Sequence, residues 1–190
     1  MQLKNVVLLG SSGSGKGTQA KLLVERFGNL CHISTGDLFR NLAAANTFAS
    51  KRVAGILAEG KFPPDYFATA LLINAISFRV REGQGFVLDG YPRTKQQAKT
   101  LDEFLLFLEA IDNTINIFID VSRAEALKRM VDRGRSDDTL ESVNSRLDLF
   151  EKEVRPVIDY YEKQGRLIRI NGEQSIEDVH KDILKALEPK

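Results

Sequence analysis

The 190-residue sequence predicts an α/β fold, in which a central five-stranded parallel sheet lies between two layers of helices. Three observations support this prediction. Short apolar runs recur along the chain, and most are continuous, as expected for strands buried on both faces. Segments with helical periodicity and capping residues separate these runs. The first apolar run leads into a glycine-rich turn and then a helix. Strands that alternate with helices predict βαβ units in one domain covering residues 1–190.

The expected elements can be read in chain order. The strand candidates are residues 6–9, a weaker run at 31–34, and then 86–89, 115–121 and 167–170. The helix candidates are residues 17–27, 36–45, 48–58, 66–81, 94–108, 123–133, 139–163 and 176–187. Gly28 suits the end of the first helix, and Ser122 with Glu125 forms a capping-box pattern. Pro156 predicts a kink or break in the helix over 139–163.

Two segments depart from simple alternation. Residues 35–81, between the second and third strands, contain about three helices, which is more than one crossover requires. A polar loop at 134–138 carries an arginine. In sheets of this kind substrates bind beyond the carboxyl ends of the strands, and insertions there form lids. Both segments are therefore candidates for substrate binding.

The glycine-rich turn has the spacing of a phosphate-binding loop. Gly10, Gly15 and Lys16 fit the pattern G-x-x-x-x-G-K within residues 10–18. Glycines let the backbone N–H groups approach phosphate oxygens, the following helix adds partial positive charge, and Lys16 adds a full charge. A simple Gly/Ser turn is the alternative, but the strand before it and the helix after it favour nucleoside polyphosphate binding.

A carboxylate and an arginine follow the third strand. Asp89 ends the apolar run 86–89, where an acid in a phosphate-loop enzyme commonly holds Mg²⁺, directly or through water. A cap on the turn before Gly90 is the alternative role for this carboxylate. Arg93 follows in a stiff turn, and its guanidinium suits bidentate phosphate binding, although it could also be a solvated loop charge.

Six arginines lie in the segments expected around this edge of the sheet. They are Arg40, Arg93, Arg129, Arg133, Arg135 and Arg146. Each alone would be an ordinary surface residue. Together they indicate a cavity for more phosphate than one nucleotide carries, and hence phosphoryl transfer between two phosphorylated molecules. No dedicated base is evident, and none is needed, because the second pKa of a monophosphate is about 6.

The composition excludes several other classes of protein. The formal net charge of +1 argues against a dedicated nucleic-acid binder. No run is apolar for long enough to span a membrane, and no signal-peptide pattern occurs. The single cysteine, Cys31, cannot form an internal disulfide or a Cys-based zinc site. We therefore expect a cytoplasmic protein without nucleic-acid or membrane partners. His32 is expected to be structural, and His180 to lie on the polar face of the last helix.

These motifs, in this order, resemble the adenylate kinase family of nucleoside-monophosphate kinases. The matching stretches are residues 10–18, 32–40, 85–94, 133–138 and 156–165. The resemblance implies a phosphate-loop α/β fold with an AMP-binding insertion at 34–63 and a short lid at 133–139. It also implies a monomer that uses Mg²⁺. A lid this short leaves no room for the extended form that binds zinc through cysteines, so no zinc is expected. Ser12 stands where the family usually has proline.

The resemblance also assigns site residues. For ATP it implies contacts from Gly13, Ser14, Gly15, Lys16, Gly17, Thr18, Arg129, Arg133 and Gln174, the last through its backbone. For AMP it implies contacts from Thr35, Arg40, Lys61, Phe62, Pro63, Gly90, Tyr91, Pro92, Arg93, Gln97, Arg135 and Arg146. The residues expected to act on the transferred group are Lys16, Arg93, Arg133, Arg135 and Arg146.

Two residues favour AMP as the acceptor. UMP/CMP kinases look similar, but they typically carry alanine at the position of Thr35 and asparagine at that of Gln97. The Gln97 amide can pair with adenine as both acceptor and donor. The expected reaction is MgATP + AMP ⇌ MgADP + ADP. A UMP/CMP kinase, or a nucleotide sensor without useful turnover, remains as an alternative.

Overall fold

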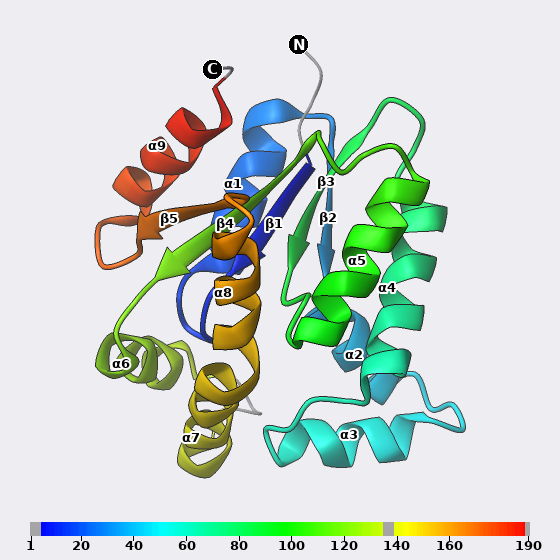
Figure 1. Cartoon of the computed structure of the whole chain (residues 1–190). Helices are drawn as coiled ribbons and strands as arrows, with labels where there is room; N and C mark the ends of the chain where they lie inside the picture. Colours follow the sequence, from blue (N-terminus) through cyan, green and yellow to red (C-terminus); the bar gives the residue numbers. More distant parts are fainter. Residues whose placement is uncertain (1–4, 135–138, 189–190) are drawn as a thin grey trace.

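The protein is a five-stranded parallel sheet with helices on both faces (Figure 1). The computed structural model describes residues 5–134 and 139–188. The strands are β1 (Asn5–Leu9), β2 (Leu30–Ser34), β3 (Gly85–Asp89), β4 (Thr114–Asp120) and β5 (Leu167–Asn171), in the order β2-β3-β1-β4-β5. The predicted fold class is confirmed, and every predicted strand is present with its ends shifted by about one residue.

The helices also fall where the sequence predicts them, with one exception. Along the chain they are α1 (Lys16–Phe27), α2 (Thr35–Ala44), α3 (Ser50–Ala58), α4 (Asp65–Arg79), α5 (Lys95–Phe107), α6 (Arg123–Arg133), α7 (Leu140–Leu149), α8 (Arg155–Lys163) and α9 (Ile176–Leu187). Three of them, α2, α3 and α4, lie between β2 and β3. The Ser122 side chain caps α6 by accepting from the Glu125 N–H, which is one half of the predicted capping box. The other half differs, because the Ser122 N–H donates to Glu173 and not to Glu125.

The exception is the predicted helix over 139–163, which is interrupted by a π-helical turn at Phe150–Val154. Pro156 lies in the first turn of α8, directly after this turn. Proline has no N–H and its ring collides with the carbonyl four residues earlier, so the regular α pattern cannot pass through it. The wider π turn accommodates the mismatch. The kink that Pro156 predicts is thus located in the preceding turn.

The core is divided by the sheet into two apolar layers. Side chains alternate along β1: Val6 and Leu8 pack with α1 and α9, whereas Val7 and Leu9 pack on the layer formed by α4, α5 and α8. Figure 1 shows the same two layers of helices on either side of the sheet. Burial on both faces explains why the β1 residues form a continuous apolar run.

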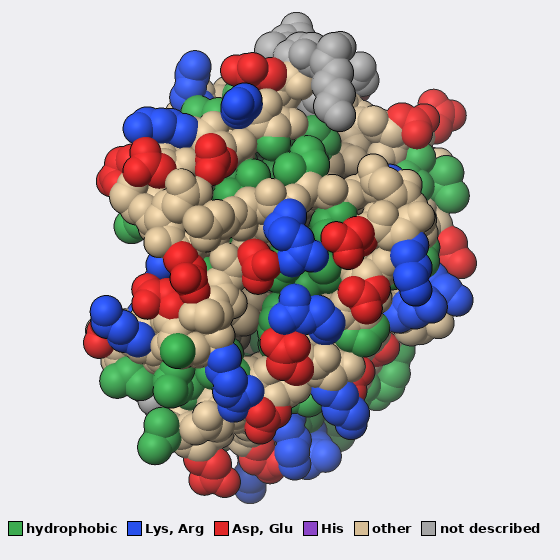
Figure 2. All heavy atoms as spheres, turned by 60° about the vertical axis from the view of Figure 1, so that its left-hand side comes forward, with side chains coloured by type: hydrophobic (Ala, Val, Ile, Leu, Met, Phe, Trp, Pro, Cys, Tyr) green, Lys and Arg blue, Asp and Glu red, His purple; other side chains and the backbone are tan. Residues whose placement is uncertain are grey.

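The outer surface mixes charges of both signs. On the face drawn in Figure 2, Lys and Arg side chains are interspersed with Asp and Glu, in keeping with the net charge of +1. Within the described residues, no helix is long and apolar enough to cross a membrane.

Strand register brings the candidate residues to one edge of the sheet. Asp89 at the end of β3 pairs with Leu8 of β1 on one side and with Ser34 of β2 on the other. The segments that follow these three strands therefore begin side by side. They are the glycine-rich loop, α2, and the turn that contains Arg93.

Candidate functional site

The loop between β1 and α1 has a backbone that only glycine accommodates. Gly10, Gly13 and Gly15 all have positive φ, of 149°, 86° and 94°. A Cβ at Gly13 would lie 2.5 Å from the Ala126 carbonyl oxygen of α6, so this loop and helix are in close contact. No side chain caps the start of α1. Its first N–H groups are thus available to an anion, as in known phosphate loops.

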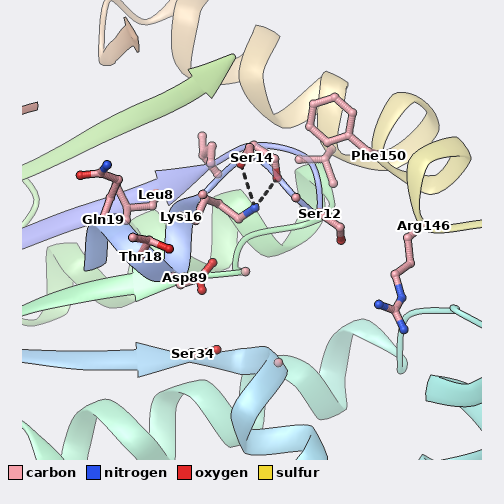
Figure 3. Close-up of a pocket in the computed structure, with 18 of the residues that line it drawn as sticks. Leu8, Ser12, Ser14, Lys16, Thr18, Gln19, Ser34, Asp89, Arg146 and Phe150 are labelled. Atoms are coloured by element: carbon pink, nitrogen blue, oxygen red, sulfur yellow. Dashed lines mark hydrogen bonds between the residues drawn. The ribbon is translucent and has the colours of Figure 1, made fainter. Parts of the chain in front are cut away.

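Lys16 lies inside the loop with its ammonium group held by the loop itself. Its Nζ donates to the Gly10 carbonyl oxygen at 2.9 Å, to the Ser11 carbonyl oxygen at 2.7 Å and to Ser14 Oγ at 3.3 Å. Figure 3 shows Lys16 hydrogen-bonded to Ser14 within the loop, with Asp89 nearby. Burial lowers the pKa of Lys16 to about 8, and nearby Asp89 partly opposes the shift.

Asp89 lies beside the start of α1, and its surroundings fit a divalent cation. One of its carboxylate oxygens would lie 3.4 Å from a Cβ at Gly17, so the glycine leaves space beside the acid. A carboxylate next to phosphate-binding N–H groups is a hard oxygen ligand of the kind that Mg²⁺ prefers, with phosphate and water completing its shell. Within the described residues, no group of three or more His, Cys, Asp or Glu is placed to hold a metal ion.

Five of the six predicted arginines line one cavity of about 740 Å³. Arg129 and Arg133 reach it from α6, Arg146 from α7, Arg40 from α2, and Arg93 from the turn before α5. Figure 3 shows Arg146 across the cavity from the loop that holds Lys16. The sixth, Arg135, lies outside the described residues, as does most of the predicted lid at 133–139.

The electrostatics of Arg93 show that these charges converge. Burial lowers the pKa of Arg93 to about 10, and the neighbouring Arg146 and Arg40 contribute to this decrease, against an opposing effect of Asp89. Positive groups held this close together repel one another, so a bound polyanion would relieve the repulsion. The positive charge of the cavity therefore favours the binding of phosphate groups.

On the side of the cavity near α2 and α3, the predicted acceptor residues contact one another. Thr35 Oγ1 and Arg93 Nε both donate to the Gly90 carbonyl oxygen, at 2.6 and 2.7 Å. The Arg93 guanidinium lies over the Phe62 ring, 4.4 Å from its centre. A nucleotide that binds to Thr35 or Arg93 must therefore replace the contacts that these side chains make with Gly90 and Phe62.

A small hollow adjoins the main cavity at this point. Its lining includes Thr35, Phe62, Pro63, Tyr91 and Gln97. The main cavity takes in the remaining predicted acceptor residues, which are Lys61, Gly90 and Pro92. The structure thus brings together the described members of the predicted acceptor set.

The opposite end of the cavity is formed by the segment before α9. Gln174 lines it, but its side chain donates to the Asn171 carbonyl oxygen and to Asp182. The expected contribution of the Gln174 backbone stays a prediction. Ser175 and Ile176 continue the same wall.

Several wall residues were not predicted from the sequence. His32, which the sequence suggested to be structural, lines the cavity, as do Phe150 and Val154 of the π turn. The only sequence signal for the last two was Pro156, which marks an irregular helix without indicating which side chains face inward. Asp65 is not a wall residue, but it hydrogen-bonds Gln97 and was likewise not predicted.

The model of the adenylate kinase family matches residues 8–166. An adenylate kinase of Oenococcus oeni is 40% identical over 176 residues, with 91% of this chain and 93% of the relative covered. An adenylate kinase of Corynebacterium urealyticum is 40% identical over 190 residues, covering 96% and 98%. One of Parabacteroides distasonis is 36% identical over 187 residues, covering 96% and 97%. With its phosphate loop and converging arginines, the chain belongs to the adenylate kinase family.

Proposed function

We propose that the cavity holds ATP and AMP together and transfers the terminal phosphoryl group of ATP to AMP, reversibly, giving two ADP. The observation that carries this proposal is the single cavity in which Lys16 of the loop faces arginines from α2, α6, α7 and the turn before α5. A single nucleoside triphosphate would not require this many positively charged side chains. Two nucleotides placed end to end, with their phosphates at the centre, would.

The ATP half consists of the loop from Gly13 to Thr18, together with Arg129, Arg133 and the Gln174 backbone. Loop N–H groups and Lys16 bind the phosphates, while the segment from Gln174 to Ile176 forms the wall for the base. The AMP half consists of Thr35, Arg40, the segment Lys61–Pro63, the turn Gly90–Arg93, and Gln97.

The chemistry follows from placement and charge. An ionised oxygen of the AMP phosphate attacks the terminal phosphorus of ATP, and the bond from that phosphorus to the bridging oxygen breaks, releasing ADP. Lys16, Arg93, Arg133 and Arg146 stabilise the negative charge on the group in transit, and we assign the same role to Arg135 from the sequence. No side chain has to remove a proton, because the attacking oxygen is already ionised near neutral pH.

Asp89 is the residue that would hold Mg²⁺, through water, beside the phosphates. When bound, this ion neutralises phosphate charge and orients the transferred group. The gap beside Gly17 and the neighbouring phosphate-binding helix start support this role for Asp89.

We further propose that residues 34–63 form a mobile acceptor-binding unit and that residues 133–139 form a short lid. Closure of both over the nucleotides would exclude water, which would otherwise accept the phosphoryl group. Because every residue assigned to the reaction lies on one chain, a monomer suffices for it.

The test is a coupled assay of ADP formation with MgATP and one acceptor at a time: AMP, CMP, UMP, GMP or none. Fast turnover with AMP alone supports the proposal. Preference for CMP or UMP would be consistent with the proposed mechanism but would contradict the assignment of AMP as the acceptor. Binding of ATP without turnover on any acceptor would indicate a nucleotide sensor instead.

A further inference from the structure

Asp65 contacts the predicted base-recognising residue from outside the cavity. It is the first residue of α4, whereas Gln97 lies in the first turn of α5. One Asp65 oxygen accepts from Gln97 Nε2 at 2.9 Å, and the other accepts from Thr94 Oγ1 at 2.6 Å. Thr94 Oγ1 in turn accepts from the Gln97 backbone N–H at 3.2 Å. Gln97 is thereby tied to α4 and to the start of its own helix.

A second contact determines which way round the amide lies. The backbone N–H of Arg93 donates to Gln97 Oε1 at 2.8 Å. A backbone N–H can only donate and a carboxylate can only accept, so a single amide orientation satisfies both neighbours. Turning the amide over would place N–H against N–H and oxygen against carboxylate. Because Gln97 is only 2% exposed, water cannot relieve that mismatch.

The fixed orientation leaves one hydrogen and one lone pair of the amide for a ligand. Each amide nitrogen carries two hydrogens and each amide oxygen two lone pairs, and the contacts with Asp65 and Arg93 use one of each. Gln97 also lines the small hollow beside the main cavity. A purine bound in the main cavity, with one edge turned toward this hollow, would meet one donor and one acceptor in a fixed order.

That order distinguishes two kinds of purine. A 6-amino purine presents a donor at position 6 and an acceptor at N1, whereas a 6-oxo purine presents an acceptor at position 6 and a donor at N1. An amide that pairs with the first kind must turn over to pair with the second. The orientation of the Gln97 amide therefore decides which base is accepted.

We propose that Asp65 is a positioning residue that locks the Gln97 amide and thereby makes the acceptor site select a 6-amino purine over a 6-oxo purine. The inference rests on the proposed function, since it takes a purine monophosphate as the phosphoryl acceptor. Asp65 itself does not line either cavity, so it acts through Gln97.

The experiment compares AMP with IMP, its 6-oxo analogue, as acceptors at saturating MgATP. In Asp65→Ala the amide loses one of its two anchors, and we expect the IMP:AMP ratio of kcat/KM to rise about tenfold. The KM for AMP should increase while kcat stays within a few-fold, because other residues hold the reacting phosphates. Asp65→Asn should keep the ratio near that of the wild type, because its amide oxygen can still accept from Gln97 Nε2.

Asp102→Asn is the matched control for a loss of stability alone. Asp102 is a buried acid that accepts from Arg166 and Tyr160, at 2.9 Å each, and it does not line the cavity. This change should lower the melting temperature and leave the ratio unchanged.

Two outcomes would overturn the inference: equal losses with AMP and IMP in Asp65→Ala, or the same change of ratio in Asp102→Asn. If the wild type does not use AMP at all, the proposed function fails instead. The ratio of the calorimetric dissociation constants of AMP and IMP, measured in the same variants, then decides the role of Asp65 separately.

Discussion

At the scale of single residues, Lys16 is the group on which the proposed transfer depends most directly. Its Nζ already lies among the loop oxygens, at 2.7 to 3.3 Å from its three partners. A phosphate entering the loop would replace those partners and meet a cation that needs no further movement of the backbone.

We predict that Lys16→Met lowers kcat at least a hundredfold while leaving the fold intact. Methionine retains the length of the side chain but removes the charge that stabilises the transferred group. Steady-state kinetics and circular dichroism check this prediction. Turnover within a few-fold of the wild type, in a variant with an unchanged spectrum, would contradict the role assigned to Lys16.

The lowered pKa of Lys16 predicts that ATP binding takes up protons. At pH 8 a group with a pKa of about 8 is half deprotonated, and a bound phosphate favours its charged form. Binding should therefore take up about half a proton at pH 8, and ATP affinity should fall as the pH rises further. Calorimetry in two buffers of different ionisation enthalpy measures the uptake. The uptake should vanish in Lys16→Arg, whose guanidinium stays charged.

At the residue scale, the sequence indicates which groups lie together where their spacing along the chain is sufficient. The loop, Lys16 and Asp89 are adjacent to recognisable strand ends, so their convergence follows from the strand order of a parallel sheet. Asp65 and Gln97 are 32 residues apart and meet only because α4 packs on α5. No local sequence pattern predicts that contact. The sequence therefore indicates Gln97 as a site residue but does not indicate Asp65 as its partner.

At the scale of elements, Gly60 is a point where the acceptor insertion contacts α7. It has a φ of 68°, and a Cβ there would lie 2.6 Å from the Ser142 carbonyl oxygen of α7. Lys61, Phe62 and Pro63 follow it directly. The position of this acceptor segment relative to α7 thus depends on the absence of a side chain.

We predict that Gly60→Ala raises the KM for AMP about three- to tenfold and leaves the KM for ATP within twofold. The added methyl group meets backbone, which cannot move aside as a side chain would, so Lys61–Pro63 must shift away from α7. Gly55→Ala on α3 is the matched control, because a Cβ there meets nothing within 4 Å. Equal KM values for AMP in the two variants would contradict the prediction.

The π turn marks the limit of sequence prediction at this scale. Pro156 indicates that a regular helix cannot continue, but it does not reveal whether the chain will bend, break or widen. That outcome depends on Phe150 and Val154, which pack in the core and also line the cavity. Tertiary packing, which the sequence pattern does not encode locally, selects the wider turn.

At the scale of the whole molecule, nucleotide binding should stabilise the fold. A ligand that binds only the folded state, at a hundred times its dissociation constant, adds about 2.7 kcal/mol to the free energy of unfolding. For a chain of this length the melting temperature should then rise by about 5–10 °C with MgATP. Differential scanning fluorimetry checks this, and Lys16→Met should lose most of the rise. An unchanged melting temperature in the wild type at that ATP concentration would contradict ATP binding by the native fold.

The sheet order has a consequence for how such a site can change its substrate. β1, followed by the loop that holds Lys16, is packed through Gly13 against α6, which carries Arg129 and Arg133. The acceptor residues lie instead on the segments that follow β2 and β3, at one side of the sheet. The proposed donor and acceptor halves therefore lie largely on different segments of the chain. Changes within residues 34–65 and 90–97, with Arg93 retained, should therefore alter which acceptor binds while leaving the residues assigned to phosphoryl transfer unchanged.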